Sequence, residues 1–319
     1  MDTQIKILIP LYNDWDSLYL LLKRIETCVP PDLFKRFSFL IINDCSQTDC
    51  DPSKIFNSID LQIVNLNRNI GHQRAIAIGL SYLSDHPTYS QVIVMDSDGE
   101  DRPEDIETML AAAEQHKGKI VFASRLKRHE GFTFRFFYKI YKFVFQMLTG
   151  KTIAFGNYCV IPAALIAKLA HVSEIWNHFS GAVIRSKLPY SAIPLNRGRR
   201  LAGESKMNFT SLILHGLGAV SVHLDQVAVR LLLFFIGLIT LAIFGIITAF
   251  GVRFFTNFPI SELTSSLILA LMIILVQAFM VCLFLVFMVL TYRTHIHFIP
   301  ALGYKDFILS VERVQGEVD

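Results

Sequence analysis

Short apolar runs alternate with amphipathic segments over the first part of the chain. The pattern predicts strands over Ile5 to Pro10, Phe37 to Ile42, Leu61 to Leu66 and Gln91 to Met95. It predicts helices over Asp16 to Glu26 and from the turn at Gly71 to Leu83. Short buried strands that alternate with helices are typical of a mostly parallel sheet that is covered on both faces. We therefore predict an α/β domain with a Rossmann-like sheet over residues 1–206.

The pattern is less regular between residues 117 and 229. It predicts a strand over Ile120 to Ala123, then a basic, aromatic helix, and then a strand and a helix around Tyr158 to Ala170. Met207 to Gln226 has the pattern of an amphipathic helix, so we expect an interfacial segment over residues 207–229.

Two long uncharged runs follow, over residues 231–252 and 267–290. Each exceeds the roughly 20 residues that an α-helix needs to cross the hydrocarbon layer of a bilayer. They predict a transmembrane hairpin over residues 230–292, followed by a tail over residues 293–319. They also explain why 52% of the 319 residues are hydrophobic, which is high for a soluble protein with one core.

Charges beside the two runs predict how the hairpin is oriented. Arg230 precedes the first run, and Arg293, Lys305 and Arg313 follow the second. The segment between the runs, from Arg253 to Ser266, holds one Arg and one Glu. The positive-inside rule then predicts a multi-pass protein of the cytoplasmic (inner) membrane, with the N-terminal domain and both termini in the cytoplasm. The five cysteines have no metal-binding spacing and would stay reduced there.

Basic residues are concentrated in two segments. Residues 117–151 hold nine Lys or Arg against one acidic residue, and residues 185–206 hold six against one. Nucleic acid would attract such segments, but the first also carries eight Phe or Tyr between residues 132 and 145. That combination favours an anionic membrane surface, so membrane lipids are an expected partner and nucleic acid is not. An ordinary amphipathic core helix is the alternative.

An acidic run follows the fourth predicted strand directly, from Asp96 to Asp101. Its four carboxylates would repel one another, and a hard divalent cation such as Mg²⁺ or Mn²⁺ relieves that repulsion. Such cations commonly complete their coordination shell with substrate phosphates, so the run predicts a nucleotide diphosphate site. The alternative is a solvated acidic turn that caps the next helix.

Four short motifs follow one another along the chain: Ile9-Pro10-Leu11-Tyr12-Asn13-Asp14, Asn43-Asp44-Cys45-Ser46, Asn69-Ile70-Gly71 and Asp96-Ser97-Asp98. In their order they resemble the motifs of family 2 glycosyltransferases. The segment from Arg200 to Lys206 resembles the Arg-x-x-Gly-x-Ser-Lys motif of the polyprenyl-phosphate branch. That branch includes dolichyl-phosphate mannose synthases and bacterial undecaprenyl-phosphate glycosyltransferases, and the apolar hairpin matches the bacterial members best.

The resemblance implies a GT-A fold and inverting transfer from a UDP- or GDP-sugar, with UDP favoured, to a polyprenyl phosphate. It implies that Pro10, Tyr12, Asp14 and Asp44 bind the donor nucleoside. It also implies that Asp96, Asp98 and Glu100 serve the metal, Mg²⁺ or Mn²⁺, and the diphosphate. The same resemblance implies that Arg125 reaches the active site. It also implies that the phosphates of the acceptor and the leaving group are bound by Arg135, Arg200, Ser205 and Lys206.

Three departures from the family pattern stand out. Asn43 replaces the first Asp of the usual pair, Asn157 replaces the Asp of a Gly-Asp-Phe segment, and the segment between Ala170 and Gly181 matches poorly. Glu100 stands where Gln is frequent, and a carboxylate there can bind metal more strongly. Asn43 and Asn157 keep a degenerate nucleotide-sugar-binding scaffold open as an alternative. A glycosyltransferase with a hydroxyl acceptor is another alternative. A processive polysaccharide synthase is disfavoured because neither Trp follows an Arg. The oligomeric state stays open, a homo-oligomer included.

Overall fold

The computed structural model describes residues 4–55, 59–125, 142–152, 155–203, 209–256, 262–294 and 298–314. The chain divides into two compact units. The first, which we call the sheet unit, comprises Met1–Arg135, Ile153–Val222 and Phe298–Asp319. The second, the helical unit, comprises Phe136–Thr152 and His223–His297.

A mixed eight-stranded sheet forms the centre of the sheet unit, in the order β7-β5-β6-β4-β1-β2-β3-β8. Its strands are β1 (Ile5–Leu11), β2 (Phe37–Asn43), β3 (Leu61–Leu66), β4 (Gln91–Val94), β5 (Ile120–Arg125), β6 (Phe155–Pro162), β7 (Tyr190–Leu195) and β8 (Ile308–Val314). The four strands β4, β1, β2 and β3 are parallel neighbours, as the sequence predicted. Strand β6 runs antiparallel to both β4 and β5, and β5 pairs with β7 in parallel.

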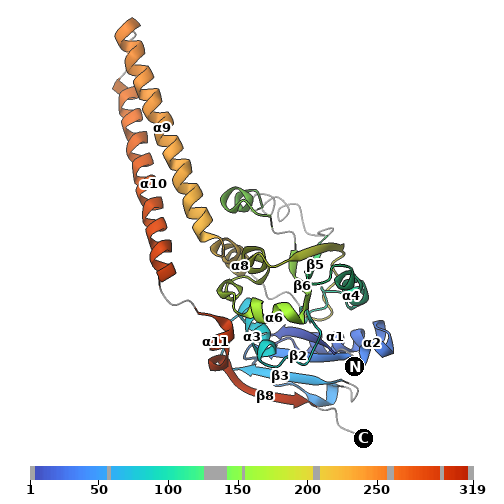
Figure 1. Ribbon diagram of the computed structural model, residues 1–319. Helices are drawn as coiled ribbons and strands as arrows, with labels where there is room; N and C mark the ends of the chain where they lie inside the picture. The colour runs from blue at the N-terminus through green and yellow to red at the C-terminus, as the bar shows by residue number, and fades with distance from the viewer. Residues whose placement is uncertain are drawn as a thin grey trace. The chain divides into compact units, whose positions relative to one another are not determined.

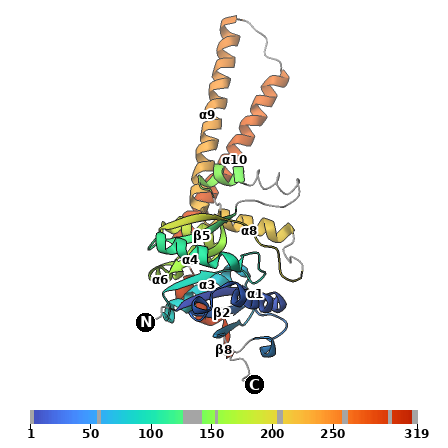
Figure 2. The ribbon, with the colours of Figure 1, turned by 90° about the vertical axis from the view of Figure 1, so that its right-hand side faces the viewer.

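Helices cover both faces of this sheet (Figures 1 and 2). One core cluster joins the strands to α1 (Trp15–Cys28), α2 (Pro31–Phe34) and α4 (Ile106–Gln115). The other joins them to α3 (His72–Asp85), α6 (Ala163–Ala170) and α7 (Phe179–Ser186). All seven positions of β2 are buried, which is why its sequence is mainly apolar, apart from Ser38 and Asn43, rather than alternating.

Short 3-10 turns and helices complete the sheet unit. The 3-10 turns are η1 (Pro52–Lys54), η2 (Pro103–Asp105), η3 (Ser173–Trp176) and η4 (Tyr304–Phe307), and the remaining helices are α8 (Phe209–Ser221) and α11 (Pro300–Gly303). The predicted helix over Met207 to Gln226 is therefore interrupted, because α8 ends at Ser221 and the next helix begins at Leu224. Of the predicted basic, aromatic helix, residues 126–141 lie outside the described residues and 142–149 are helical.

The expected tail over residues 293–319 belongs in part to the sheet. Strand β8 pairs antiparallel with β3, and the Arg313 guanidinium lies 2.8 Å from the Asp60 carboxylate. Tyr304 is buried, and its hydroxyl donates to Asp85 at 2.8 Å. The sequence predicted a tail instead of a strand because seven residues carry little signal of their own. The strand is recognised only from its pairing with β3, which lies about 250 positions earlier in the chain.

The helical unit contains two long apolar helices, α9 (Leu224–Thr256) and α10 (Glu262–Thr294), which pack against each other. By length and composition, Leu224–Val252 and Ser265–Thr291 could each cross a membrane. Large apolar side chains are exposed along both helices, among them Leu241, Phe244, Ile274 and Phe284. Exposed apolar surface of this extent is typical of helices that face lipid.

Candidate functional site

Four loops meet at one edge of the sheet because the parallel strands β1, β2, β3 and β4 all end there. The loops contain Tyr12 to Asp14, Asp44, Gly71 and the acidic run that begins at Asp96. Ligands of open α/β sheets bind beyond the carboxyl ends of the strands. The position predicted for Asp44 and Asp96 is therefore confirmed.

The acidic run is folded around its own carboxylates. The Asp101 side chain accepts the Asp96 backbone N–H at 2.9 Å, and the Asp98 side chain accepts the Glu100 backbone N–H at 3.0 Å. Gly99 has a φ of +78°, a left-handed conformation that favours glycine. Neither η2 nor α4 has a side-chain hydrogen bond at its N-cap, so the run does not act as a helix cap.

Arg200 connects two of the predicted site carboxylates. Its guanidinium lies 2.5 Å from Asp14 and 3.2 Å from Asp98, and its Nε donates to the Ala202 carbonyl at 2.8 Å. All three charged side chains are largely buried, with 16–20% of each exposed. Residues from three distant parts of the sequence thus form one charge cluster.

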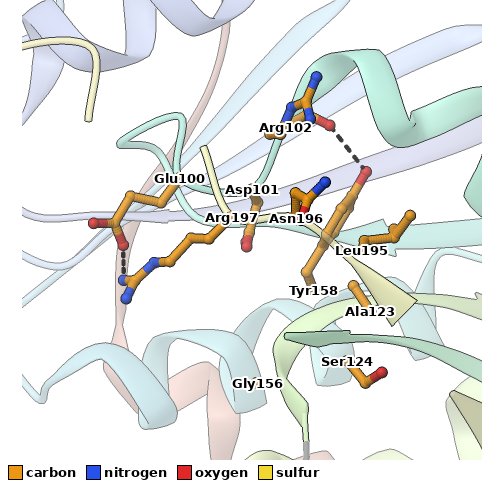
Figure 3. A pocket seen from close by; sticks show the side chains of 10 residues that line it. All are labelled: Glu100, Asp101, Arg102, Ala123, Ser124, Gly156, Tyr158, Leu195, Asn196 and Arg197. Carbon is orange, nitrogen blue, oxygen red and sulfur yellow. Dashed lines mark hydrogen bonds and ion pairs between the residues drawn. The ribbon is translucent and has the colours of Figure 1, made fainter. Parts of the chain in front are cut away.

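A basic strap, residues 196–203, lies over the acidic run. The Gly198 N–H donates to the Glu100 carbonyl at 2.8 Å, and the Leu201 N–H donates to the Asp98 carbonyl at 2.9 Å. A methyl group at Gly198 would lie 2.6 Å from the Gly99 carbonyl oxygen, so glycine permits this close approach. Arg197, to which the sequence assigned no role, forms an ion pair with Glu100 (Figure 3).

A small hollow lies behind this contact (Figure 3). Its walls include Asp101, Ser124, Tyr158 and Asn196, and the Tyr158 hydroxyl donates to the Arg102 carbonyl at 3.4 Å. The hollow is partly open, and its space of about 20 Å³ has room for about one water molecule. A sugar nucleotide therefore does not fit in it.

The first loop is connected to the turn after β2. The Asn13 N–H donates to Ser46 Oγ at 2.8 Å, and the Gln47 N–H donates to Asn13 Oδ1 at 2.7 Å. In the same loop, Tyr12 is 40% exposed, whereas Pro10 is buried in β1. Tyr12 is therefore accessible to a ligand at this edge, and Pro10 shapes the strand end.

Asp44 binds the loop that precedes α3. Its two carboxylate oxygens accept the Ile70 and Gly71 N–H groups at 2.7 and 2.8 Å. Burial raises the pKa of Asp44, although these two hydrogen bonds oppose the rise. The neighbouring Asn43 donates to Asn65 Oδ1 at 2.8 Å and accepts the Ser46 N–H, which explains locally why an amide serves at this position.

Several predicted residues cannot be placed fully. Arg135, Ser205 and Lys206 lie outside the described residues. Arg125 ends strand β5, and only its backbone is described. The predicted roles of these four residues stay predictions.

The predicted metal residues have separate protein partners. Among the described residues, no group of three His, Cys, Asp or Glu side chains is arranged to hold a metal ion. Asp98 pairs with Arg200, Glu100 pairs with Arg197, and Asp96 lies beside His72. Asp96 and Asp98 are nevertheless close enough to affect each other's charge, and a pair of carboxylates suits Mg²⁺ or Mn²⁺, which fill their shell with phosphate and water.

The electrostatics of the cluster are dominated by Asp98. Burial, and after it the negative charge of Asp96, raises the pKa of Asp98 to about 6, although Arg200 and Arg197 oppose the rise. Burial alone would lower the pKa of His72, but the carboxylates of Asp96, Asp101 and Asp98 raise it above its ordinary value. This region therefore attracts positive charge.

We expect Asp98→Asn to stabilise the metal-free protein above pH 6. An aspartate whose pKa is about 6 when folded and 3.8 when unfolded disfavours folding once it ionises, by roughly 3 kcal/mol at pH 7.5. The cost disappears below about pH 3, where both states are protonated. Thermal unfolding of the detergent-solubilised chain with EDTA should show a higher Tm for the variant than for the natural protein at pH 7.5, and no difference in Tm at pH 3. An equal shift at both pH values would contradict this electrostatic origin.

Comparison with known proteins agrees with this architecture. Residues 6–170, about half of the chain, match the family model described as "Glycosyl transferase family 2". Glucosyl-3-phosphoglycerate synthase from Mycobacterium tuberculosis, solved with Mn²⁺, UDP-glucose and phosphoglyceric acid, is similar at a TM-score of 0.51 and 13% identity, over 70% of this chain and 80% of that one.

Two further structures are similar at lower TM-scores. The mannosyltransferase PcManGT from Pyrobaculum calidifontis, solved with GDP-mannose and Mn²⁺, has a TM-score of 0.46 and 16% identity, over 72% of this chain and 64% of that one. TarS from S. aureus has a TM-score of 0.44 and 15% identity, over 72% of this chain and 40% of that one. The chain thus spans less than two thirds of either protein. The fold is of the GT-A type, and the chain belongs to glycosyl transferase family 2.

Proposed function

We propose that this nucleotide-sugar transferase moves a sugar, with inversion, onto a polyprenyl phosphate at a membrane surface. A UDP-sugar is the favoured donor, undecaprenyl or dolichyl phosphate is the acceptor, and Mg²⁺ or Mn²⁺ is required. The observation that carries the proposal is the Arg200 bridge, which joins the loop of Asp14 to the acidic run at Asp98.

The donor half of the site follows from the loops at the strand ends. Tyr12, Asp14 and Asp44 would face the nucleoside, and Asp96 and Asp98 would hold the cation, with Glu100 beside them. When bound, the cation neutralises the diphosphate and stabilises it as a leaving group. Arg200 and Arg197 neutralise Asp98 and Glu100 in the structure described here, so their guanidiniums become available to phosphate when the carboxylates bind a cation.

The acceptor half follows from the chemistry of a phosphate monoester. Its second pKa is about 6, so it is largely a dianion at neutral pH and is already a nucleophile. A sugar hydroxyl would instead need a general base. The enzyme's task then becomes to position two polyanions at one anomeric carbon, and Arg125, Arg135, Arg200, Ser205 and Lys206 would offset their repulsion.

The path of the chain supports a membrane location for this reaction. The chain leaves the sheet unit at Val222, forms the two apolar helices, and returns at Phe298 to add β8 to the sheet. When both helices cross the membrane, the start of α9 and the end of α10 are on the same side, because both connect to the sheet unit. The flanking Arg and Lys residues assign that side to the cytoplasm.

An acceptor assay on the purified full-length protein tests the proposal. Radiolabelled UDP- and GDP-sugars are supplied with Mn²⁺ and either undecaprenyl phosphate or an alcohol of the same chain. We expect an organic-soluble, lipid-linked monosaccharide only with the phosphate, and more of it from a UDP-sugar. Product with the alcohol but not with the phosphate would overturn the acceptor assignment. Donor binding without any product would favour the alternative, a membrane-tethered scaffold.

A further inference from the structure

His72 lies beside the acidic run although the sequence assigned it no function. It is the first residue of α3, and the preceding Ile70 and Gly71 are held by hydrogen bonds to Asp44. Its Nε2 atom lies 3.2 Å from Asp96 Oδ1. The His72 side chain is 41% exposed and that of Asp96 is 28% exposed, while the Asp96 Oδ1 atom itself is buried.

A chain of hydrogen bonds leads to the same Nε2 atom. The Phe179 backbone N–H donates to Gln73 Oε1 at 2.6 Å, and Gln73 Nε2 donates to Asn157 Oδ1 at 3.3 Å. Asn157 Nδ2 then lies 3.0 Å from His72 Nε2. Because a backbone N–H can only donate, it determines the orientation of both amides. His72 Nε2 therefore faces a donor on one side and a carboxylate on the other.

No protonation state of His72 satisfies both neighbours. When Nε2 carries a proton it can donate to Asp96, but its N–H then faces the N–H donor of the Asn157 amide. With a lone pair, it can accept from Asn157 but faces a carboxylate oxygen at 3.2 Å, an unfavourable contact between two acceptors. A cation bound to Nε2 and Asp96 removes the second conflict, and the partly buried Asn157 amide can then donate to water.

We infer that His72 Nε2 and the Asp96 carboxylate are ligands of one divalent cation. The inference rests on the metal dependence proposed above and adds a nitrogen ligand to it. Adjacent ligands of an octahedral cation with bonds of about 2.1 Å lie roughly 3.0 Å apart, close to the separation observed. Together with the Asp98 carboxylate proposed above, these protein ligands suffice because the diphosphate and water supply the others.

A nitrogen ligand changes which cation the site prefers. Mg²⁺ prefers oxygen ligands, whereas imidazole is a good ligand for transition metals. The His72 and Asp96 pair therefore favours Mn²⁺ over Mg²⁺. Replacing His72 with glutamine, which offers oxygen or an amide but no imidazole, should reduce this preference rather than abolish all metal binding.

Pulsed electron paramagnetic resonance of Mn²⁺ tests this directly on the full-length protein in detergent with UDP. We expect ¹⁴N coupling to Mn²⁺ in the natural protein, a change to the ¹⁵N pattern after labelling with ¹⁵N-histidine, and loss of the signal in His72→Gln. The Mn²⁺ affinity of that variant should fall by about 10- to 100-fold, and its Mg²⁺ affinity should change less. His86→Gln, at the C-terminal end of the same helix, is the matched control and should keep both.

The outcomes separate the two proposals. Mn²⁺ that binds without histidine coupling would overturn the His72 assignment and leave the metal-dependent transfer intact. Failure of the natural protein to bind Mn²⁺ at all would overturn both. Equal losses of Mn²⁺ and Mg²⁺ affinity in His72→Gln would contradict the predicted metal preference.

Discussion

Replacing Asp98 with alanine is expected to lower turnover by roughly 10³-fold or more. Asp98 is paired with Arg200 and feels the charge of Asp96, and only 17% of its side chain is exposed. Loss of this carboxylate removes a proposed cation ligand, and with it the charge that offsets the leaving diphosphate. Such interactions commonly account for rate factors of 10²–10³ or more.

Turnover of Asp98→Ala should be measured with nucleotide-sugar, undecaprenyl phosphate and increasing Mn²⁺. The increase in Tm that Mn²⁺ and UDP produce in the natural protein should disappear, while the protein should still be recovered from membranes. Asp32→Ala is a matched control because the Asp32 side chain is 98% exposed at α2, where it pairs with the exposed surface residue Lys35. Near-normal turnover of Asp98→Ala at saturating donor would refute the metal assignment.

Arg200→Lys is expected to lower turnover by roughly 10²-fold, although it keeps the positive charge. The guanidinium contacts Asp14 with one nitrogen, Asp98 with another and the Ala202 carbonyl with the third. A lysine ammonium is a single point charge on a flexible stem and cannot hold three acceptors in one plane. The loop of Asp14 and the acidic run would therefore lose their common partner.

The measurement for Arg200→Lys is a comparison of kcat with the Kd of the donor. We expect both to worsen, because the bridge joins two loops of the proposed donor site and the same guanidinium is proposed to contact phosphate during transfer. Arg199→Lys is the matched control, since Arg199 is adjacent in the strap and exposed. Natural turnover and donor affinity in Arg200→Lys would show that the bridge has no part in catalysis.

Local patterns were sufficient for much of the fold. The four apolar runs from Ile5 to Met95 became β1 to β4 within one or two residues, because most of their positions are buried and so carry a mainly apolar signal. The two uncharged runs lie within α9 and α10 for a different reason: a long run without charge is typical of a membrane-spanning helix, whose apolar side chains are exposed. The position of Asp96 at a strand end followed from the run that precedes it.

Contacts between distant residues carried no such local signal. Strand β8 has an ordinary, partly exposed pattern, and only its pairing with β3 turns the expected tail into part of the sheet. Arg197 resembled any other basic residue of its segment until the fold placed it against Glu100. His72 likewise resembled an isolated histidine, although its position after Gly71, at the start of the helix behind a strand end, was a signal that could have been used.

The acidic run shows what the local sequence determines and what depends on the tertiary structure. By itself the sequence determined that four carboxylates follow a buried strand, because hydrophobic burial specifies the strand and its end. Only the tertiary structure decided that Arg200, about 100 residues later, neutralises Asp98, that the strap closes on Glu100, and that His72 stands beside Asp96. The physical reason is that ion pairs act over a few ångströms, and which charges come that close depends on the packing of the whole sheet unit.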